Sequence, residues 1–368
     1  MTDVSKKDQL FQLIQANPFI SQQELAGQLQ LSRSAVAGYI AGLIRERRIL
    51  GRAYVLPGEN PVVCIGGANM DRKVRTLGAL QMGTSNPVSQ HESLGGVARN
   101  IAENLARLGA PVSLLTALGD DAAAQAMLAQ AESVGMDMRG SLQLAGSASG
   151  SYTAVLDDLG EMVLALSHMQ LCDELTPQFL ASRQPQRAAA AMTIADLNLP
   201  EASIRLLLQD AARDAVPLVL VAVSQPKMAR LPADLHGLRL LILNQGELEA
   251  RVGKTLENEE QIAEACRVVQ QQGAQDLIVT FGGDGVLYTS PNTSPLGVQR
   301  LAAPKVAVVD VTGAGDAFSA AVCWSLSREP GDLALACRHG LTLAAMTIQS
   351  AATVCTDLTP ASLAELLA

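Results

Sequence analysis

Short apolar runs recur along residues 61–368, and segments with helical spacing of apolar residues separate them. The runs are continuous and rich in Val, Ile and Leu: VVCIG (62–66), VSLLTAL (112–118), AAAMTIADL (189–197), PLVLVAVS (217–224), LRLLILN (238–244) and DLIVTFG (276–282). Continuous apolar strands that alternate with helices are typical of a parallel sheet covered on both faces. The pattern therefore predicts one α/β domain for this part of the chain.

Two segments of this domain follow a different pattern. Residues of about 72–94 and 149–170 alternate polar and apolar positions and turn at glycines. Such alternation predicts half-exposed antiparallel strands outside the main sheet. We expect these strands to form a small β flap, or lid, which can exclude water from a neighbouring site.

Residues 1–57 predict a separate small domain. Apolar positions at helical spacing predict helices over 6–16, 21–29 and about 32–47. Ser21 and Glu24 form the pattern of a capping box at the start of the second helix. The stretch RRILGRAYVL (47–56) alternates around a glycine and predicts a β-hairpin. The turn-rich residues 58–61 then serve as a linker to the larger domain.

Composition limits the class of protein. The chain has 368 residues, of which 48% are hydrophobic and 17% charged, so it is ordered and long enough for two or three domains. Aromatic residues are only 3%, which argues against a single-strand nucleic-acid binder that stacks bases. The six cysteines are scattered, the N-terminus lacks an apolar signal core, and no run of 18 apolar residues exists. We therefore expect a reduced cytoplasmic protein with no membrane association.

Charge is distributed unevenly. Residues 1–56 carry seven of the 27 basic residues and four of the 36 acidic ones, a net of +3, which leaves 20 basic and 32 acidic residues, a net of −12, for the rest. The order of helix, turn, helix and then a basic hairpin resembles the winged helix-turn-helix domain of bacterial regulators. The resemblance places Arg33 and Ser34 in a DNA major groove and Arg52 of the wing on a phosphate. The alternative is a helical domain used for protein contacts.

The strongest motif is DVTGAGDAF (310–318). It follows an apolar run, VAVV (306–309), that predicts a strand, and it precedes a helix-like segment. Backbone N–H groups at such a helix N-terminus can converge on an anion. The N–H groups expected to do so are those of Gly313, Ala314 and Gly315.

Asp316 lies in the first turn of the same predicted helix, where its carboxylate can accept a proton from a hydroxyl group. An anion cradle beside a base suits the transfer of a phosphoryl group to an alcohol. A lone motif of this kind is more often a glycine turn with an aspartate as helix cap. Other segments must therefore decide between the two interpretations.

Two segments suit a substrate that carries several hydroxyl groups. IGGANMD (65–71) ends the first apolar run of the domain, and LGGVARNIAENLARLG (94–109) places a glycine pair before a helix. A carboxylate can accept hydrogen bonds from two hydroxyls, and an amide can both donate and accept them. The residues expected around the substrate are Asn69, Asp71, Gly95, Gly96 and Asn100.

Two further segments suit a nucleotide. ILNQGELEA (242–250) places Asn244 and Glu247 three residues apart after an apolar run, a spacing suited to Mg²⁺ coordination through water. VTFGGDGVLY (279–288) is a glycine-rich turn whose backbone can approach a nucleotide closely. The residues expected to border the nucleotide in this turn are Thr280, Gly282, Gly283 and Gly285.

These segments, in this order, resemble the ribokinase-like (PfkB-type) carbohydrate and nucleoside kinases over about residues 61–368. The resemblance implies a helix-covered parallel sheet with a β lid, acting with ATP and Mg²⁺. It implies that Asp316 is the catalytic base, that Gly313–Gly315 form the anion hole and that Glu247 serves Mg²⁺ through water. It further implies that Thr312 lies at the nucleotide. A monovalent-cation loop begins at the position of Asp310 in this family, so K⁺ is an additional candidate cofactor.

The substrate is less sharply indicated. GGANMD (66–71), TSNP (84–87) and SYTAVLDDLGEM (151–162) look most like bacterial pseudouridine kinases, which implies phosphorylation of a nucleoside 5′-hydroxyl. Another nucleoside or a free pentose is the alternative. TSNP either reads a base edge from the lid or is simply a turn, which Ser and Asn before Pro favour.

Two functions of the whole chain compete. The first is a nucleoside kinase with an attached DNA-binding module. The second is a transcriptional regulator whose kinase-like body senses a nucleoside or a sugar. Paired half-sites and a lid of the kind that joins subunits in related kinases both imply a homodimer. The retained Asp316 favours the enzyme, because a sensor has no need of a base.

Overall fold

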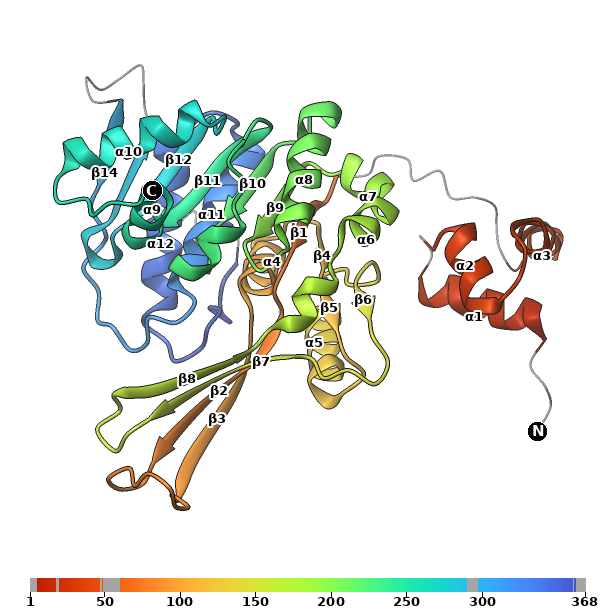
Figure 1. Cartoon of the computed structure of the whole chain (residues 1–368), viewed down its shortest axis with the longest axis horizontal. Coiled ribbons are helices and arrows are strands. Elements are labelled where there is room, and N and C mark those ends of the chain that lie inside the picture. Colours follow the sequence, from red (N-terminus) through yellow and green to blue (C-terminus); the bar gives the residue numbers. More distant parts are fainter. Residues whose placement is uncertain are drawn as a thin grey trace.

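The computed structural model describes residues 5–17, 20–46, 48, 60–289, 297–359 and 361. Three helices form a small N-terminal unit, and an α/β body follows it (Figure 1). The helices are α1 (Lys6–Ala16), α2 (Gln22–Leu29) and α3 (Arg33–Arg45). They confirm the helices expected from the sequence, although α3 ends two residues early. The expected hairpin at 47–56 and most of the linker lie outside the described residues.

Local sequence explains the starts of these helices. Ser21 and Glu24 form the capping box at the start of α2, with bonds of 2.8 and 3.1 Å. Val36 and Leu43 of α3 are fully buried against Leu10 and Leu25. The stripe of apolar residues therefore faces the core of this unit, as its 3.6-residue spacing predicts.

The body is built on an eight-stranded sheet in the order β14-β13-β12-β11-β10-β9-β1-β4. Its strands are β1 (Val62–Ile65), β4 (Val112–Leu115), β9 (Met192–Asp196), β10 (Leu218–Val221), β11 (Leu238–Asn244), β12 (Asp276–Thr280), β13 (Val286–Thr289) and β14 (Val298–Leu301). Neighbours from β4 to β12 pair in parallel, and β13 and β14 pair antiparallel. The expected helix-covered parallel sheet is confirmed, with an antiparallel edge.

Helices cover both faces of this sheet (Figure 1). One face packs against α4 (Val97–Arg107), α5 (Ala122–Ser133), α11 (Ala314–Arg328) and α12 (Leu333–Thr347). The other packs against α6 (Pro177–Ser182), α8 (Glu201–Asp214), α9 (Gln245–Val252) and α10 (Glu259–Gln271). Shorter elements connect these: β5 (Ala117–Leu118), β6 (Leu142–Gln143), α7 (Gln184–Ala188), and the 3-10 helices η1 (Gln170–Glu174), η2 (Gln225–Arg230) and η3 (Gly282–Asp284).

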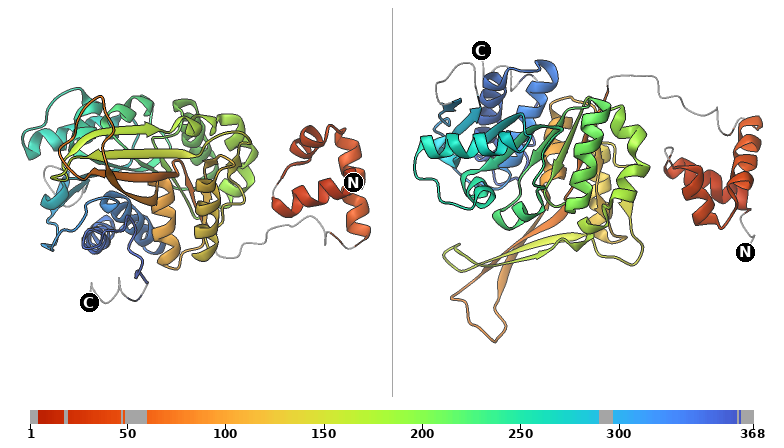
Figure 2. Two further views of the ribbon diagram at one scale, coloured as in Figure 1. Left: turned by 90° about the horizontal axis from the view of Figure 1, so that it is seen from below. Right: turned by 45° about the horizontal axis from the view of Figure 1, so that its top comes forward.

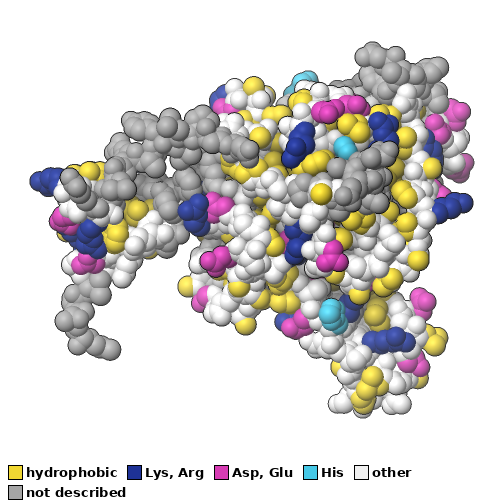
Figure 3. Space-filling model, turned by 180° about the vertical axis from the view of Figure 1, so that it is seen from behind, with side chains coloured by type: hydrophobic (Ala, Val, Ile, Leu, Met, Phe, Trp, Pro, Cys, Tyr) yellow, Lys and Arg dark blue, Asp and Glu magenta, His cyan; other side chains and the backbone are white. Residues whose placement is uncertain are grey.

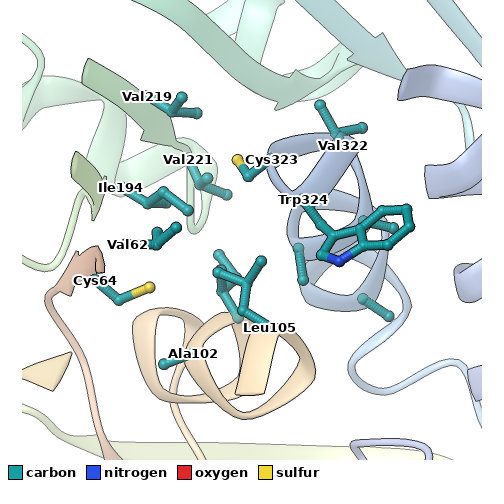
Figure 4. Packing of buried hydrophobic residues seen from close by; sticks show 14 of the residues in the cluster. Val62, Cys64, Ala102, Leu105, Ile194, Val219, Val221, Val322, Cys323 and Trp324 are labelled. Carbon is teal, nitrogen blue, oxygen red and sulfur yellow. The ribbon is translucent and has the colours of Figure 1, made fainter. Parts of the chain in front are cut away.

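The packing between α4 and α11 positions the site. Val62 and Ile194 of the sheet pack with Leu105 of α4 and Trp324 of α11 in one buried cluster (Figure 4). The Trp324 indole N–H also donates to the carbonyl of Leu108, just beyond the end of α4, at 3.2 Å. Because interiors of this kind are close-packed, the two helices hold a fixed relation to each other. Their N-terminal turns carry the polar residues described below.

A second sheet projects from the body as the lid (Figure 2). Its order is β3-β2-β7-β8, formed by β2 (Asn69–Thr76), β3 (Val88–Gly95), β7 (Gly150–Leu156) and β8 (Met162–His168). The expectation of purely antiparallel strands is wrong at the centre of the lid. β2 and β7 pair in parallel, because each leaves the body in the same direction and returns through its own antiparallel partner.

One expected strand is absent. VAVV (306–309) has no strand pairing, and Val308 and Val309 are 59% and 64% exposed. Val306 and Val308 instead line a cavity, so this apolar run forms the wall of a site rather than a layer of the core. Within the described residues, no helix is both long and apolar enough to cross a lipid bilayer.

Candidate active site

Asp316 lies in the first turn of α11 and meets Asn100 in the first turn of α4. The Asn100 Nδ2 donates to Asp316 Oδ2 at 2.7 Å, although the two residues are 216 positions apart in the chain. Asn100 is 3% exposed and Asp316 is half-buried, so the contact is only partly shielded from solvent. The structure thus brings together one residue from each of the two motifs.

Burial controls the ionisation of Asp316. Loss of solvent raises its pKa to about 7, against the hydrogen bond from Asn100, which lowers it. The negative charges of Asp196 and Asp71 raise the pKa further. A carboxylate with a pKa near the working pH is suited to general base catalysis, because it both accepts and returns a proton readily.

A buried ionic network fixes the side chain of Asn100. Arg99, which is 4% exposed, donates from Nη1 to Asn100 Oδ1 at 2.8 Å and to the carbonyl of Leu94 at 3.0 Å. Glu103 forms ion pairs with both Arg99 and Arg107. Because Arg99 can only donate, the Asn100 oxygen faces it and the Asn100 NH₂ faces Asp316. Sequence analysis did not identify Arg99 as part of the site.

The two glycines at the start of α11 have different structural requirements. Gly313 caps the helix at φ +82°, and a Cβ there would lie 2.0 Å from the carbonyl oxygen of Thr353. Gly315 has open space where a Cβ would project. Among the described residues, the N–H groups of Gly313, Gly315 and Asp316 have no hydrogen-bond partner. The Ala314 N–H, which was also expected in the cradle, instead donates to the carbonyl of Val311 at 3.3 Å. The turn therefore presents three unpaired donors at a helix N-terminus, where an anion is favoured.

The expected substrate residues gather at the junction of lid and body. Asn69 and Asp71 lie on one face of β2, and the Asn69 Nδ2 donates to Asp71 Oδ1 at 2.5 Å. Burial raises the pKa of Asp71 despite this bond. A Cβ on Gly95 would lie 2.0 Å from Asp71 Oδ2, and Gly96 caps α4 at φ +102° against the backbone of residue 67. Both glycines are therefore required for the approach of β2 to α4.

Asp196 holds these two loops together. This fully buried carboxylate at the end of β9 accepts N–H groups from Gly67 at 2.9 Å, Ala98 at 3.0 Å and Asn198 at 2.9 Å. Its pKa is raised by burial, and the three N–H bonds oppose that shift. Sequence analysis did not propose Asp196 as a site residue. The available signal was an aspartate at the carboxyl end of a buried strand, where ligand sites in parallel sheets form.

A cavity of about 500 Å³ adjoins the N-terminus of α11. Thr280, Gly282, Gly283 and Gly285 line one side of it, as the glycine-rich turn suggested. The remaining lining comes from β13, the 303–311 segment, the start of α11, and α12 with the residue after it: Val286, Ala303, Pro304, Lys305, Val306, Val308, Val311, Ala314, Gly315, Phe318, Leu341, Ala344, Ala345 and Ile348. An apolar slot that ends at a helix N-terminus suits a planar ring with an anionic tail.

Asn244 and Glu247 lie outside the lining of this cavity and cap α9. The Asn244 side chain accepts from the Glu247 N–H at 2.9 Å, and Glu247 Oε2 accepts from the Asn244 N–H at 2.8 Å. Burial raises the pKa of Glu247, which is 4% exposed. The pair is thus first of all a capping box, a role that the spacing also predicts. Among the described residues, no group of three or more His, Cys, Asp or Glu side chains could hold a metal ion.

Asp310 and Thr312 meet a residue from the lid. Thr312 donates to Asp310 Oδ1 from its backbone at 2.9 Å and from its hydroxyl at 2.6 Å. Lys73 of β2 forms an ion pair with Asp310 and donates to Thr312 Oγ1 at 3.2 Å. Neither Asp310 nor Thr312 lines the cavity. Lys73 was not a candidate from the sequence.

On the N-terminal unit, α3 presents an exposed face of small and basic residues. Arg33, Ser34 and Gly38 are exposed, and Arg33 donates to Gln23 of α2 at 2.9 Å. Small side chains allow a helix to enter a groove closely. Arg52, the expected phosphate contact, lies outside the described residues.

Comparison with known proteins gives two family matches. Residues 60–358 match the model described as pfkB family carbohydrate kinase, and residues 9–49 match that of a winged helix-turn-helix DNA-binding domain. The chain is 31% identical over 338 residues to the uncharacterized sugar kinase YeiI of Escherichia coli K12, covering 90% of this chain and 92% of that one. It is 35% identical over 266 residues to the pseudouridine kinase of the same organism, covering 72% and 83%.

Solved structures share the fold. Arabidopsis thaliana ribokinase complexed with ribose and ATP superposes with a TM-score of 0.74 at 20% identity, covering 84% of this chain and 98% of that one. A putative sugar kinase from Clostridium perfringens gives a TM-score of 0.73 at 24% identity, covering 84% and 96%.

Proposed function

Because the chain belongs to the pfkB family of carbohydrate kinases, we propose that it phosphorylates the 5′-hydroxyl of a nucleoside with ATP, and that pseudouridine is the substrate. The family match confirms the resemblance drawn from the sequence. The observation that carries the proposal is the half-buried Asp316–Asn100 pair beside an open helix N-terminus. A sensor that only binds a ligand needs no carboxylate with a pKa raised to about 7 at this place.

In the proposed reaction the substrate hydroxyl lies against Asp316 and the γ-phosphate lies at the N-terminus of α11. The hydroxyl oxygen forms the new bond to phosphorus while the bond from the γ-phosphorus to the β,γ-bridging oxygen breaks, and ADP leaves. Asp316 takes the hydroxyl proton. The N–H groups of Gly313, Gly315 and Asp316 stabilise the negative charge on the transferring group, because no described residue accepts a hydrogen bond from them.

The residues present fit Mg²⁺ that arrives with the nucleotide. Glu247 uses Oε2 as a helix cap, and Oε1 accepts no hydrogen bond from any described residue. One carboxylate together with phosphate oxygens and water is the usual Mg²⁺ environment at phosphoryl-transfer sites. When bound, Mg²⁺ neutralises charge on the phosphates. Asn244 acts on this end of the site by fixing Glu247.

Two features bear on the nucleoside. The 35% identity to a pseudouridine kinase supports pseudouridine, and the 31% identity to an uncharacterized sugar kinase leaves another nucleoside or a free pentose as the alternative. TSNP forms the loop between β2 and β3, where the Asn86 amide is bonded to Gln81 at 2.8 Å and to Thr84 at 3.1 Å. This loop is therefore a turn, and Asn86 has its hydrogen bonds within it.

A substrate panel tests the proposal. With ATP and Mg²⁺, we expect pseudouridine to give a kcat/KM at least about tenfold above that of uridine, inosine or ribose, because polar contacts built for one base reject others. Coupled detection of ADP measures the rate. Faster phosphorylation of ribose or inosine would overturn pseudouridine but keep the kinase, and ADP release without a phosphorylated acceptor would overturn both.

The two glycines of the anion cradle provide a matched pair of variants. Gly315→Ala should leave the melting temperature within about 2 °C of wild type, because its Cβ meets open space, yet reduce kcat by about 10- to 100-fold by placing a methyl group where the phosphoryl group passes. Gly313→Ala should lower the melting temperature by several degrees for two reasons. Its φ of +82° is strained for alanine, and its Cβ would clash with the carbonyl oxygen of Thr353. Calorimetry and steady-state rates measure both. Equal destabilisation by the two variants would contradict this division.

The N-terminal unit supports a second function, DNA binding by a homodimer. The exposed Arg33 and Ser34 of α3 would enter the major groove, with Arg52 on a phosphate. The face of the lid opposite Asp71 and Lys73 supports the dimer, since the strand register puts Leu164 and Leu166 there, 51% and 54% exposed. Figure 3 shows hydrophobic side chains on this projecting lid.

Fluorescence anisotropy on genomic DNA fragments tests DNA binding, and sedimentation of the same samples tests the dimer. We expect a dimer whose affinity for DNA falls steeply as the salt concentration rises. Arg33→Ala should show a weaker dependence of that affinity on salt. A monomer, or binding without salt dependence, would contradict them.

A further inference from the structure

Lys73 connects the lid to the glycine loop of the body. On β2, Asn69, Asp71 and Lys73 occupy alternate positions and therefore share the face that meets the body. Lys73 is the last of the three, and its ammonium reaches Asp310 and, at 3.2 Å, the hydroxyl of Thr312. Its side chain is 36% exposed and that of Asp310 is 23% exposed, so the pair is partly shielded from solvent. This ion pair joins segments 237 residues apart.

Both oxygens of Asp310 are in use. Oδ1 accepts the backbone N–H and the hydroxyl of Thr312, and Oδ2 accepts the Lys73 ammonium. Burial alone would raise the pKa of Asp310, but the hydrogen bonds from Lys73 and Thr312 outweigh it and hold the pKa below its usual value. Asp310 is therefore an anion with a fixed partner at the entry to the loop that leads to Gly313.

This arrangement does not fit a K⁺ ion on Asp310. The sequence resemblance implies a monovalent-cation loop that begins at this residue, and a K⁺ ion there would take the carboxylate as an oxygen ligand. The ammonium of Lys73 already occupies Oδ2 and carries the same single positive charge. A cation could enter only by displacing a side chain that is tethered to the same protein, and tethering gives Lys73 a high effective concentration.

We propose that Lys73 serves as the built-in cation of the glycine loop, so that this kinase needs no monovalent cation. The ammonium neutralises Asp310, orients Thr312, and holds the lid strand against the loop that forms the anion cradle. Lys73 is a positioning residue, because it acts on the cradle through Asp310 and Thr312. The activity readout below rests on the proposed function, whereas the thermal readout does not.

The thermal experiment compares melting temperatures in KCl and in tetramethylammonium chloride at equal ionic strength. Wild type should differ by less than about 1 °C between the salts. Lys73→Met should melt lower in tetramethylammonium chloride and regain about 3 °C in 100 mM KCl, as binding of a cation to a vacated site predicts. Arg75→Met is the matched control, since Arg75 lies on the same strand and bonds to the carbonyl of Asp158 instead. It should show no difference between the salts.

The kinetic experiment uses the same salts. Wild-type kcat should change less than about twofold between them. Lys73→Met should lose about tenfold in tetramethylammonium chloride and recover at least fivefold in KCl, and Lys73→Arg should stay independent of K⁺ because it keeps the charge.

Activation of wild type by K⁺, or a Lys73→Met protein that responds to K⁺ in neither experiment, would overturn the proposal. If Lys73→Met does not fold, the wild-type comparison and Lys73→Arg still decide. If no substrate of the panel is phosphorylated, the proposed function fails, and the thermal comparison alone decides the role of Lys73.

Discussion

Replacing Asp316 by Asn is expected to lower kcat by about 10²- to 10⁴-fold while leaving the dissociation constant for nucleoside within about threefold of wild type. The amide keeps the shape and can still accept the bond from Asn100, but it cannot take the hydroxyl proton. Steady-state rates and isothermal titration calorimetry measure the two quantities. Wild-type turnover in Asp316→Asn would contradict the assignment of the base.

The pH dependence follows from the same carboxylate. Because burial raises its pKa to about 7, kcat/KM of wild type should rise with pH and level off above about pH 7. Loss of the Arg99 charge should move the rise in kcat/KM to higher pH, since that positive charge lowers the pKa of Asp316. Arg99→Met therefore tests whether the rise reflects ionisation of Asp316.

Stability should change in the opposite sense to activity. An unfolded aspartate loses its proton near pH 4, whereas the folded Asp316 keeps its proton until about pH 7, so the wild-type protein loses free energy of unfolding as pH rises between these values. Above pH 7 the full cost is present, on the order of 2–4 kcal/mol. Asp316→Asn should thus melt higher than wild type at pH 8 and equally at pH 4. Asp158→Asn changes an exposed carboxylate of the lid and is the control. It should leave the melting temperature unchanged at both pH 8 and pH 4.

Asp196→Ala is expected to be the most destabilising single change near the site. It would leave the N–H groups of Gly67, Ala98 and Asn198 buried without an acceptor, at about 1–3 kcal/mol each, a total of about 3–9 kcal/mol. Asp196→Asn retains an acceptor for two of the three N–H groups. It should therefore lose about a third as much free energy of unfolding as Asp196→Ala. Denaturant unfolding measures the difference. Equal losses in the two variants would show that the cost is not set by these bonds.

The same substitutions should also reduce activity, because Asp196 fixes the loop before β2 and the start of α4 at once. Ser203→Ala is a suitable control. It removes one buried hydrogen bond, to the Leu175 carbonyl at 2.6 Å, on the other face of the sheet. It should cost about 1 kcal/mol and leave kcat unchanged.

Much of the fold could be predicted from the sequence because its elements have strong local signals. The buried runs of β1 and β9 to β12 are continuous and apolar, and the capping boxes at Ser21 and Asn244 mark helix starts without reference to tertiary structure. The antiparallel pattern of the lid was wrong only at β2 and β7, since alternation reports which face of a strand is buried but not the direction of its neighbour.

The candidate site was less predictable. Asp316 and Asn100 lie in recognisable motifs, but their contact depends on the packing of α4 against α11. Arg99 lies in the same motif as Asn100, but sequence alone does not distinguish it from a surface charge on that helix. Lys73 and Asp196 likewise resemble an ordinary surface charge and an ordinary strand end. Val306 and Val308 were expected in a strand, because a ligand-binding wall and a core strand need the same side chains.

Product analysis tests the central claim most directly. Wild type and Asp316→Asn are incubated with ATP, Mg²⁺ and pseudouridine, and ADP and nucleoside monophosphate are quantified by mass spectrometry. The account predicts one nucleoside 5′-phosphate formed per ADP with wild type, and at least about a hundredfold less with Asp316→Asn. The claim would be contradicted if wild type phosphorylated no nucleoside or pentose of the panel. It would also be contradicted if wild type and Asp316→Asn formed equal amounts of product.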